Sequence, residues 1–152
     1  MEEKKRILVV DDDDAILKSV ATILQLKGYE VDTAETGGQA IEKSQSQLFN
    51  LALLDIKLPD MEGTDLLVRM HQTTPRMMKI MLTGYPSLQN AVVALNLGAD
   101  AYLLKPVNPK DLLKVVEEKL TEQREAEALS EDRVAEWVRT RLRKAQQENR
   151  SE

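Results

Sequence analysis

The chain has 152 residues, of which 42% are hydrophobic and 31% are charged, and its formal net charge is -5. This length allows one domain with a substantial core. The chain contains no cysteine and one histidine, His71, which excludes disulfides, thiolate metal sites, cysteine nucleophiles and multi-histidine metal centres.

The acidic charge balance argues against a nucleic-acid surface, which is usually basic. No apolar run approaches the ~20 residues that span a membrane, and the N-terminal residues lack the apolar core of a signal peptide. We therefore expect a cytoplasmic protein with no membrane association and no direct nucleic-acid binding.

The first element is predicted at residues 7–10, where four apolar and mostly β-branched residues are typical of a strand buried on both faces. Four aspartates, residues 11–14, follow directly. Their repulsion is relieved if a divalent cation binds there or if some of them cap the next helix. We assign Asp14 to the helix cap, while Asp13 has no assigned role.

Further apolar segments alternate between strand and helix patterns along the chain. Strands are predicted at residues 29–34, which alternate in polarity and suit a sheet edge, and at 51–54, 79–82 and 101–104. Helical spacing marks five intervening or following helices. Their apolar residues are Ile16, Val20, Ile23 and Leu24; Ala40, Ile41 and Leu48; Leu66, Leu67 and Met70; Leu88, Ala91, Val92 and Leu95; and Leu112, Leu113, Val116 and Leu120.

Alternating strands and helices predict an α/β fold, with a doubly wound, five-stranded parallel sheet and helices on both faces. Ligands of such sheets bind at the carboxyl ends of the strands. We call this side of the sheet the carboxyl edge. The polar residues expected there are Asp11, Asp12, Asp55, Thr83 and Lys105.

These side chains suit phosphoryl chemistry. Three carboxylates favour Mg²⁺, which prefers oxygen ligands. An amine and a hydroxyl beside them describe a cradle for the oxygens of a phosphoryl group in transfer. Asp55 is the candidate nucleophile because it stands alone at a strand end, before a loop that contains proline and glycine.

Four motifs, in this order, resemble the receiver domain of two-component response regulators over roughly residues 5 to 120. They are Val-Val-Asp11-Asp12, Asp55 with Lys57-Leu58-Pro59 and Gly63, Leu-Thr83-Gly84, and Tyr102-Leu-Leu-Lys105-Pro. The resemblance implies a flavodoxin-like sheet of order 2-1-3-4-5.

The resemblance also implies a metal site. The side chains of Asp12 and Asp55, with the backbone carbonyl of Lys57, would hold Mg²⁺, and Asp11 would act on it mainly through water. The Lys57 side chain stands two residues past the acceptor, at a position that influences hydrolysis of the acyl phosphate.

The remaining implied roles concern phosphorylation and its consequences. Asp55 would accept the phosphoryl group from the phosphohistidine of a sensor histidine kinase or a phosphotransfer protein. Lys105 would bind a phosphoryl oxygen, Thr83 would swing towards the group, and Tyr102 would change rotamer with it.

Residues 121–152 lie outside the resemblance and are predicted to form a helical tail rather than a separate output domain. A helix start at Ser130 precedes an apolar face; a continuous helix from Asn108 to about residue 146 is the alternative. Such a face could fold back on the receiver, pair with a second copy or dock on a partner. Its residues are Val134, Trp137, Val138, Leu142 and Ala145.

We therefore interpret the chain as a receiver that phosphorylates itself from a donor and slowly dephosphorylates, without being a conventional enzyme. One alternative is a Mg²⁺-dependent phosphohydrolase of the haloacid dehalogenase type, with Asp11 and Asp13 as its paired acids, although 152 residues leave little room for the cap domain of that family. Another is the receiver fragment of a longer transcriptional regulator.

Overall fold

The computed structural model of the protein describes residues 3–84 and 87–150. The chain divides into two compact units, Met1–Leu120 and Thr121–Glu152. Strands and helices alternate throughout the first unit. The elements are β1 (Arg6–Val10), α1 (Asp14–Leu26), β2 (Glu30–Ala34), α2 (Gly37–Ser46), β3 (Leu51–Leu54), α3 (Gly63–Thr73), β4 (Met78–Thr83), α4 (Leu88–Asn96), β5 (Ala101–Leu104) and α5 (Pro109–Arg150).

All five strands are parallel, and their order in the sheet is β2-β1-β3-β4-β5. This confirms the predicted fold class and strand order. Val10 pairs with Leu54, and Leu54 pairs with Met81, so β1, β3 and β4 reach the carboxyl edge in register. The residues that follow β1 and β3 are therefore neighbours in space.

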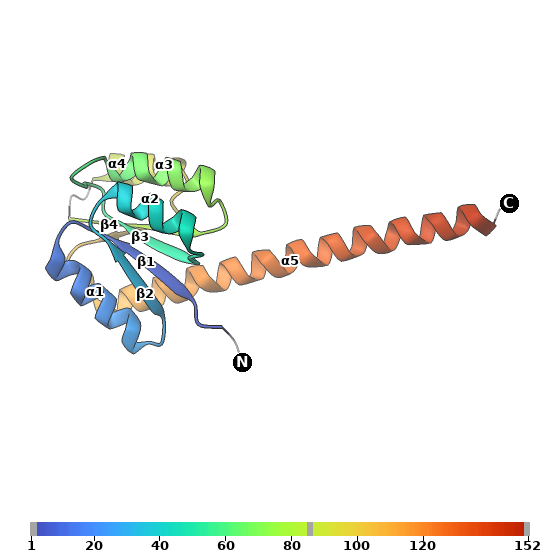
Figure 1. Cartoon of the computed structure of the whole chain (residues 1–152), viewed down its shortest axis with the longest axis horizontal. Coiled ribbons are helices and arrows are strands. Elements are labelled where there is room, and N and C mark those ends of the chain that lie inside the picture. The colour runs from blue at the N-terminus through green and yellow to red at the C-terminus, as the bar shows by residue number, and fades with distance from the viewer. Residues whose placement is uncertain (1–2, 85–86, 151–152) are drawn as a thin grey trace. The chain divides into compact units, whose positions relative to one another are not determined.

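Helices cover both faces of the sheet (Figure 1). On one face, α1 and the first turns of α5 pack on alternate strand residues such as Val9 and Leu53. On the other face, α2, α3 and α4 pack on the intervening ones, such as Val10 and Leu54. Because β1 and β3 are covered on both sides, residues 7–10 and 51–54 are continuously apolar, which is why these strands were recognisable in the sequence.

Two local predictions were wrong. The cap of α1 is Asp13, whose carboxylate accepts hydrogen bonds from the backbone N–H groups of Ala15 and Ile16; Asp14 is already inside the first turn. Leu48 does not belong to the second helix, because α2 ends at Ser46 and the Leu48 side chain is 79% exposed. Spacing alone does not tell a helix residue from an apolar residue in the following loop.

The fourth helix is present, but its buried side is not the one that the apolar spacing suggested. Ala94 is fully buried, whereas Val92 and Leu95 are about half exposed. The small side chain lets α4 approach the sheet closely.

The last helix runs unbroken from Pro109 to Arg150, so the continuous alternative is the one observed. In the first unit, Leu112, Val116 and Leu120 of this helix are buried in the core. Across the residues that the structure describes, no helix combines the length and apolarity needed to cross a membrane.

Candidate functional site

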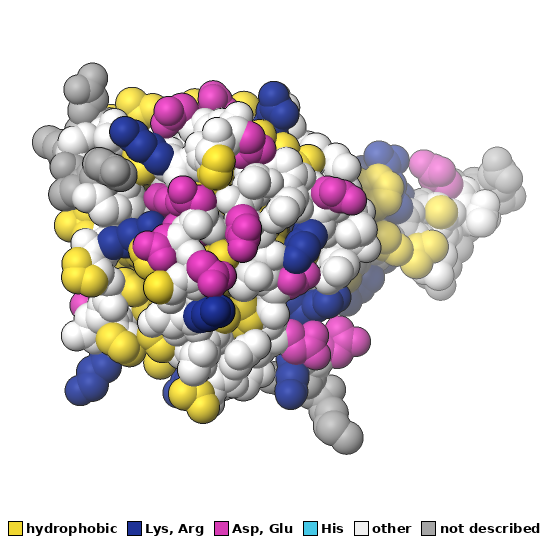
Figure 2. Space-filling model, turned by 60° about the vertical axis from the view of Figure 1, so that its left-hand side comes forward, with side chains coloured by type: hydrophobic (Ala, Val, Ile, Leu, Met, Phe, Trp, Pro, Cys, Tyr) yellow, Lys and Arg dark blue, Asp and Glu magenta, His cyan; other side chains and the backbone are white. Residues whose placement is uncertain are grey.

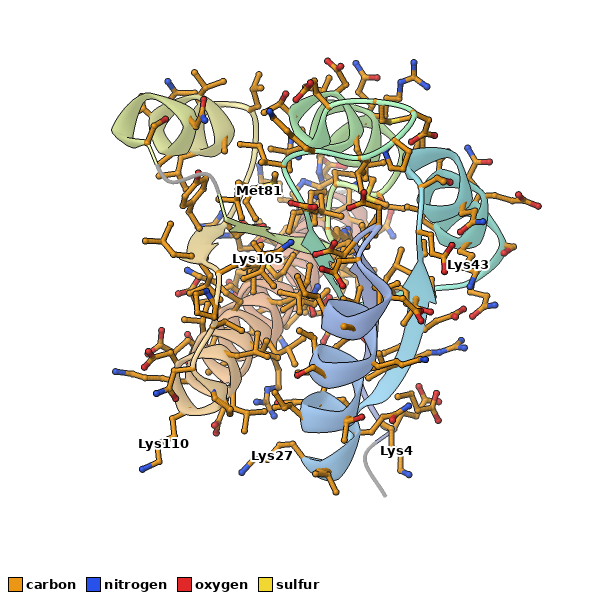
Figure 3. All side chains as sticks on the ribbon, turned by 90° about the vertical axis from the view of Figure 1, so that its left-hand side faces the viewer. Lys4, Lys27, Lys43, Met81, Lys105 and Lys110 are labelled. Atoms are coloured by element: carbon orange, nitrogen blue, oxygen red, sulfur yellow. The ribbon has the colours of Figure 1, made fainter. Side chains whose placement is uncertain are left out.

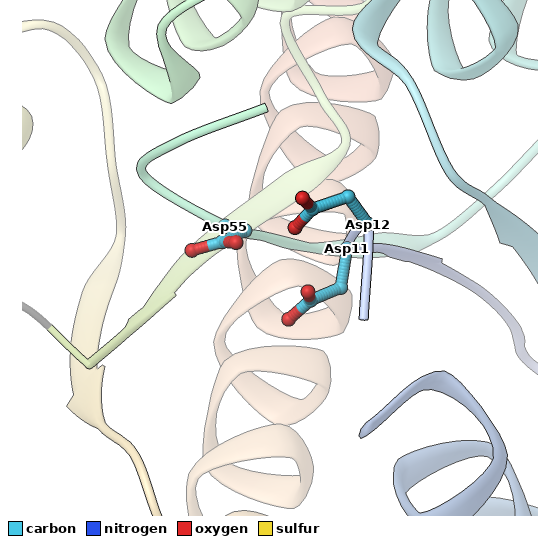
Figure 4. A group of neighbouring side chains, drawn as sticks. All are labelled: Asp11, Asp12 and Asp55. Carbon is cyan, nitrogen blue, oxygen red and sulfur yellow. The ribbon is translucent and has the colours of Figure 1, made fainter. Parts of the chain in front are cut away.

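Three carboxylates meet at the carboxyl edge. Asp11 and Asp12 follow β1, and Asp55 follows β3; one oxygen from each lies within 4.8 Å of the others. Figure 4 shows the Asp55 side chain on one side and those of Asp11 and Asp12 on the other. Asp11 is 2% exposed and Asp55 is 6% exposed, whereas Asp12 faces solvent. An all-oxygen set of this kind fits a hard divalent cation such as Mg²⁺.

Backbone hydrogen bonds fix two of these acids. The N–H of Asp11 donates to the carbonyl of Ala34 at 3.1 Å, and the N–H of Asp55 donates to the carbonyl of Val10 at 3.0 Å. Asp11 Oδ1 also accepts from the N–H of Asp13 at 2.9 Å. The acids are thus held at the ends of the sheet ladder before any ligand binds.

Lys105 supplies the positive charge of the site. It follows β5, and its Nζ pairs with Asp11 Oδ2 and lies 3.4 Å from Asp55 Oδ2. The peptide bond that joins it to Pro106 is cis. In Figure 3, Lys105 lies near the middle of the carboxyl edge, while Lys4, Lys27, Lys43 and Lys110 lie at the periphery.

The protonation equilibria reflect this crowding. Burial raises the pKa of Asp55, and the negative charge of Asp11 raises it further, against the lowering effect of Lys105 and of the N–H groups of Ile56 and Lys57. Burial acts to lower the pKa of Lys105, but its hydrogen bond to Asp11 and the charges of both acids outweigh burial and raise it. Lys105 is therefore held in its charged ammonium form, and further positive charge would stabilise the carboxylate of Asp55.

A hollow of about 600 Å³ opens over these groups. Besides Asp11, Asp12, Asp55 and Lys105, it is lined by Asp13, Ile16, Lys57, Leu58, Pro59 and Gly84. Acidic side chains are numerous on this side of the molecule, with lysine and arginine among them (Figure 2). The hollow is large enough for a phosphoryl group, a cation and its waters.

The loop after Asp55 returns close to its own start. The N–H of Gly63 donates to the carbonyl of Ile56 at 2.7 Å, and a Cβ at Gly63 would lie 2.0 Å from the Asp55 carbonyl oxygen. Only glycine fits there without a shift of the backbone. This contact gives Gly63 a physical role in holding the candidate acceptor.

Asp60 belongs to the loop after Asp55, and sequence reasoning missed its role. Its two carboxylate oxygens accept hydrogen bonds from the N–H groups of Gly37 and Gly38, both at 2.9 Å, at the start of α2. These bonds lower the pKa of Asp60. The acceptor loop is thus tied to a helix that lies 22 residues earlier in the chain. The glycine pair after Thr36 offered a weak signal, since it leaves N–H groups accessible.

The two predicted switch residues do not line the hollow. Thr83 ends β4 and is fully buried, and its carbonyl accepts from the N–H of Lys105 at 2.7 Å. Tyr102 lies in β5 and packs on the cluster beneath α3 and α4. Its buried hydroxyl has no hydrogen-bond partner among the described residues. An unsatisfied buried hydroxyl is costly, so it favours a rotamer or a water that would satisfy it.

Comparison with known proteins identifies the class of this fold and site. Residues 7–117 match the response regulator receiver domain. The chain therefore belongs to the receiver domain family of two-component response regulators. This agrees with the sequence-based identification and does not favour the phosphohydrolase alternative.

Particular relatives extend the comparison. The alginate biosynthesis transcriptional regulatory protein AlgB of Pseudomonas syringae pv. tomato is 38% identical over 84% of this chain and 28% of its own length. The alkaline phosphatase synthesis transcriptional regulatory protein PhoP of Bacillus subtilis is 34% identical over 71% of this chain and 45% of its own length. A CheY-like receiver domain protein from Methanospirillum hungatei has a crystal structure that superposes with a TM-score of 0.79 at 58% identity, covering 82% of this chain and 99% of that one.

The chain thus spans less than half of each of these two transcriptional regulators but nearly all of the CheY-like protein. The shared portion includes the receiver domain.

Proposed function

We propose that this receiver accepts a phosphoryl group on Asp55 from a phosphohistidine of a sensor histidine kinase or a phosphotransfer protein. The observation that carries the proposal is the placement of a buried Asp55 carboxylate 3.4 Å from Lys105, beside two further acids. Of the two other acids, Asp11 is buried but pairs more tightly with Lys105, and Asp12 is not buried.

In the proposed reaction, a carboxylate oxygen of Asp55 attacks phosphorus, a P–O bond forms, and the P–N bond to the donor histidine breaks. The electron pair of that bond stays on the histidine nitrogen. Mg²⁺, when bound, would offset the negative charge of the phosphoryl oxygens. We assign its ligands to the side chains of Asp12 and Asp55 and the backbone carbonyl of Lys57, with Asp11 acting through water.

Other residues of the chain orient the group and respond to it. Lys105 would hold a phosphoryl oxygen through its ammonium. Thr83 would donate to another oxygen after a rotation, and Tyr102 would follow it, which its unsatisfied hydroxyl supports. Since the receiver supplies all of these groups, the transfer and the slow hydrolysis are properties of residues 1–120, and residues 121–152 are a tail outside the chemistry.

The first prediction tests the acceptor. Incubation with Mg²⁺ and acetyl phosphate or phosphoramidate should add one phosphoryl group to the protein, detected by intact mass spectrometry. Asp55→Asn should abolish this addition because the amide is not a nucleophile. Asp11→Asn should still be modified, more slowly, because it keeps the acceptor.

The same series separates the alternatives. Modification that persists in Asp55→Asn and disappears in Asp11→Asn would contradict the acceptor assignment and favour a nucleophile after β1. Asp65→Asn, which changes an exposed acid in the first turn of α3, is the matched control.

The proposal of no direct nucleic-acid contact is restricted to the receiver itself. Residues 1–120 carry 18 acidic and 14 basic side chains, a net charge of -4, which opposes binding to phosphates. The relatives AlgB and PhoP are named as transcriptional regulators over sequences far longer than the shared portion. Any DNA contact of such a protein is therefore proposed to lie outside its receiver.

A further inference from the structure

The second unit presents apolar side chains to solvent. In the tail helix, residues 121–150 of α5, Val134 is 60% exposed, Trp137 is 61% exposed and Val138 is 42% exposed. These three residues lie close to the midpoint of the segment. Exposed apolar side chains grouped in this way are typical of an interaction surface.

The charges of the tail helix are arranged about the same midpoint. Residues 121–132 carry five acidic side chains and one basic, residues 133–138 carry one of each, and residues 139–150 carry five basic and one acidic. The net charges of these three segments are -4, 0 and +4. We call the outer two the acidic arm and the basic arm.

Interaction with the helix dipole does not account for this pattern. Acidic residues are stabilised in the first turn of a helix, and basic residues in the last. However, α5 begins at Pro109, so the acidic arm lies in the interior of the helix, far beyond its first turn. The acidic arm therefore gains nothing from the dipole.

We propose that the tail helices of two copies of this chain pair in an antiparallel arrangement. With the two-fold axis between residues 135 and 136, Val134 faces Trp137 of the second copy, and Glu127 faces Lys144 of the second copy. Residues 127, 134 and 141 repeat at seven-residue intervals, and so do residues 130, 137 and 144. Because the second series lies three residues after the first, all six positions share one face of the helix.

The charges select the direction of pairing. In an antiparallel pair, each acidic arm lies along a basic arm, and Val134 and Trp137 of the two copies meet at the centre. In a parallel pair, Glu127 would face Glu127 and Lys144 would face Lys144, which is repulsive. A second copy is the occupant that the chain itself specifies, since it carries both complementary charges and the matching apolar centre.

This pairing is independent of the proposed phosphorylation, so each can fail alone. We expect the full chain to form a dimer whose dissociation constant rises as NaCl is raised from 50 to 500 mM, measured by sedimentation equilibrium. Glu127→Lys and Lys144→Glu should each weaken the dimer by about tenfold, because two symmetry-related pairs become repulsive. The double variant Glu127→Lys/Lys144→Glu should restore the dimer, since it recreates both pairs in reverse.

Disulfide trapping tests the direction separately. The natural chain has no cysteine, so each introduced thiol is unique. An equimolar mixture of Glu127→Cys and Lys144→Cys proteins should form the mixed disulfide, while each variant alone should cross-link poorly. A parallel pair would give the opposite result, with each variant cross-linking to itself.

Several results would overturn the proposal: a monomer at all concentrations and salts, self-cross-linking of each cysteine variant, or a double charge variant no better than the singles. Co-sedimentation of a monomeric chain with phosphatidylglycerol vesicles would instead make the basic arm a lipid-binding segment. Mass spectrometry of Asp55 phosphorylation on the same samples would show whether the receiver itself is intact.

Discussion

Lys105 is the residue on which the balance of charge at the carboxyl edge depends. Its ammonium pairs with Asp11 and lies 3.4 Å from Asp55, and both of these carboxylates are buried. Without the ammonium, two like charges would remain in a place with little water to screen them.

We therefore expect Lys105→Met to lower the free energy of unfolding by about 2 kcal/mol in EDTA. Mg²⁺ should recover more stability in this variant than in the natural protein, because the cation then supplies the missing positive charge. Urea unfolding followed by circular dichroism, with and without Mg²⁺, measures both effects. Lys110→Met, which alters an exposed lysine of α5, should change neither. A variant as stable as the natural protein in EDTA would contradict the ion-pair account.

Lys79 is a second lysine that the fold withdraws from solvent, more completely than Lys105. It is 1% exposed in β4, and its Nζ donates to the carbonyl of Met77 at 2.7 Å. Burial lowers its pKa, and the charge of Asp100 only partly opposes this. The folded state therefore binds this proton less tightly than the unfolded state does.

The sign of the resulting pH dependence follows from linkage. Between the lowered pKa of Lys79 in the folded state and the pKa of about 10.4 in the unfolded state, the unfolded state binds more protons than the folded state. The natural protein should therefore gain stability relative to Lys79→Met as the pH rises through this range. The gain is about 1.4 kcal/mol for each unit by which the pKa is lowered. Urea unfolding of both proteins at several pH values measures it, with Lys27→Met, at an exposed position, as the control. A difference that stays constant with pH would contradict the lowered pKa.

At the level of the elements, the start of α1 shows how two adjacent acids differ. Asp13 accepts from two backbone N–H groups as the cap, while Asp14 pairs with Lys18 on the exposed surface at 3.1 Å. Surface pairs of this kind contribute little.

Asp13→Ala should therefore cost about 1 kcal/mol of stability, and Asp14→Ala less than half of that. Thermal unfolding in EDTA measures this difference without any contribution from metal binding. Equal losses, or a larger loss for Asp14→Ala, would return the cap to Asp14.

The elements also show which features the sequence could predict. A parallel sheet brings the carboxyl ends of its strands to one edge, so acids that follow buried strands had to be neighbours, and Asp11, Asp12 and Asp55 are. The bonds from the start of α2 to Asp60 were signalled only weakly by the glycine pair, because they join a loop to a helix start through a tertiary contact. The burial of Lys79 was equally hidden, since nothing in a strand pattern marks a lysine whose Nζ donates to the backbone carbonyl just before its own strand.

At the scale of the whole chain, the two units differ in how much apolar surface they bury and in how their charges are distributed. The receiver buries apolar clusters on both faces of a sheet, and three of its acids meet at one edge. The tail helix buries little by itself and carries segregated charge. Salt should therefore act mainly on self-association of the tail and only weakly on the stability of the receiver core.

Trp137 is the sole tryptophan of the chain, and it lies in the tail helix. Its indole is 61% exposed, with the guanidinium of Arg141 5.2 Å from the ring centroid. The tryptophan fluorescence of the protein therefore reports on the tail, and the receiver contributes almost nothing to it. A blue shift with rising protein concentration would register the burial of this indole directly. Events at Asp55 need an optical probe placed in the receiver itself.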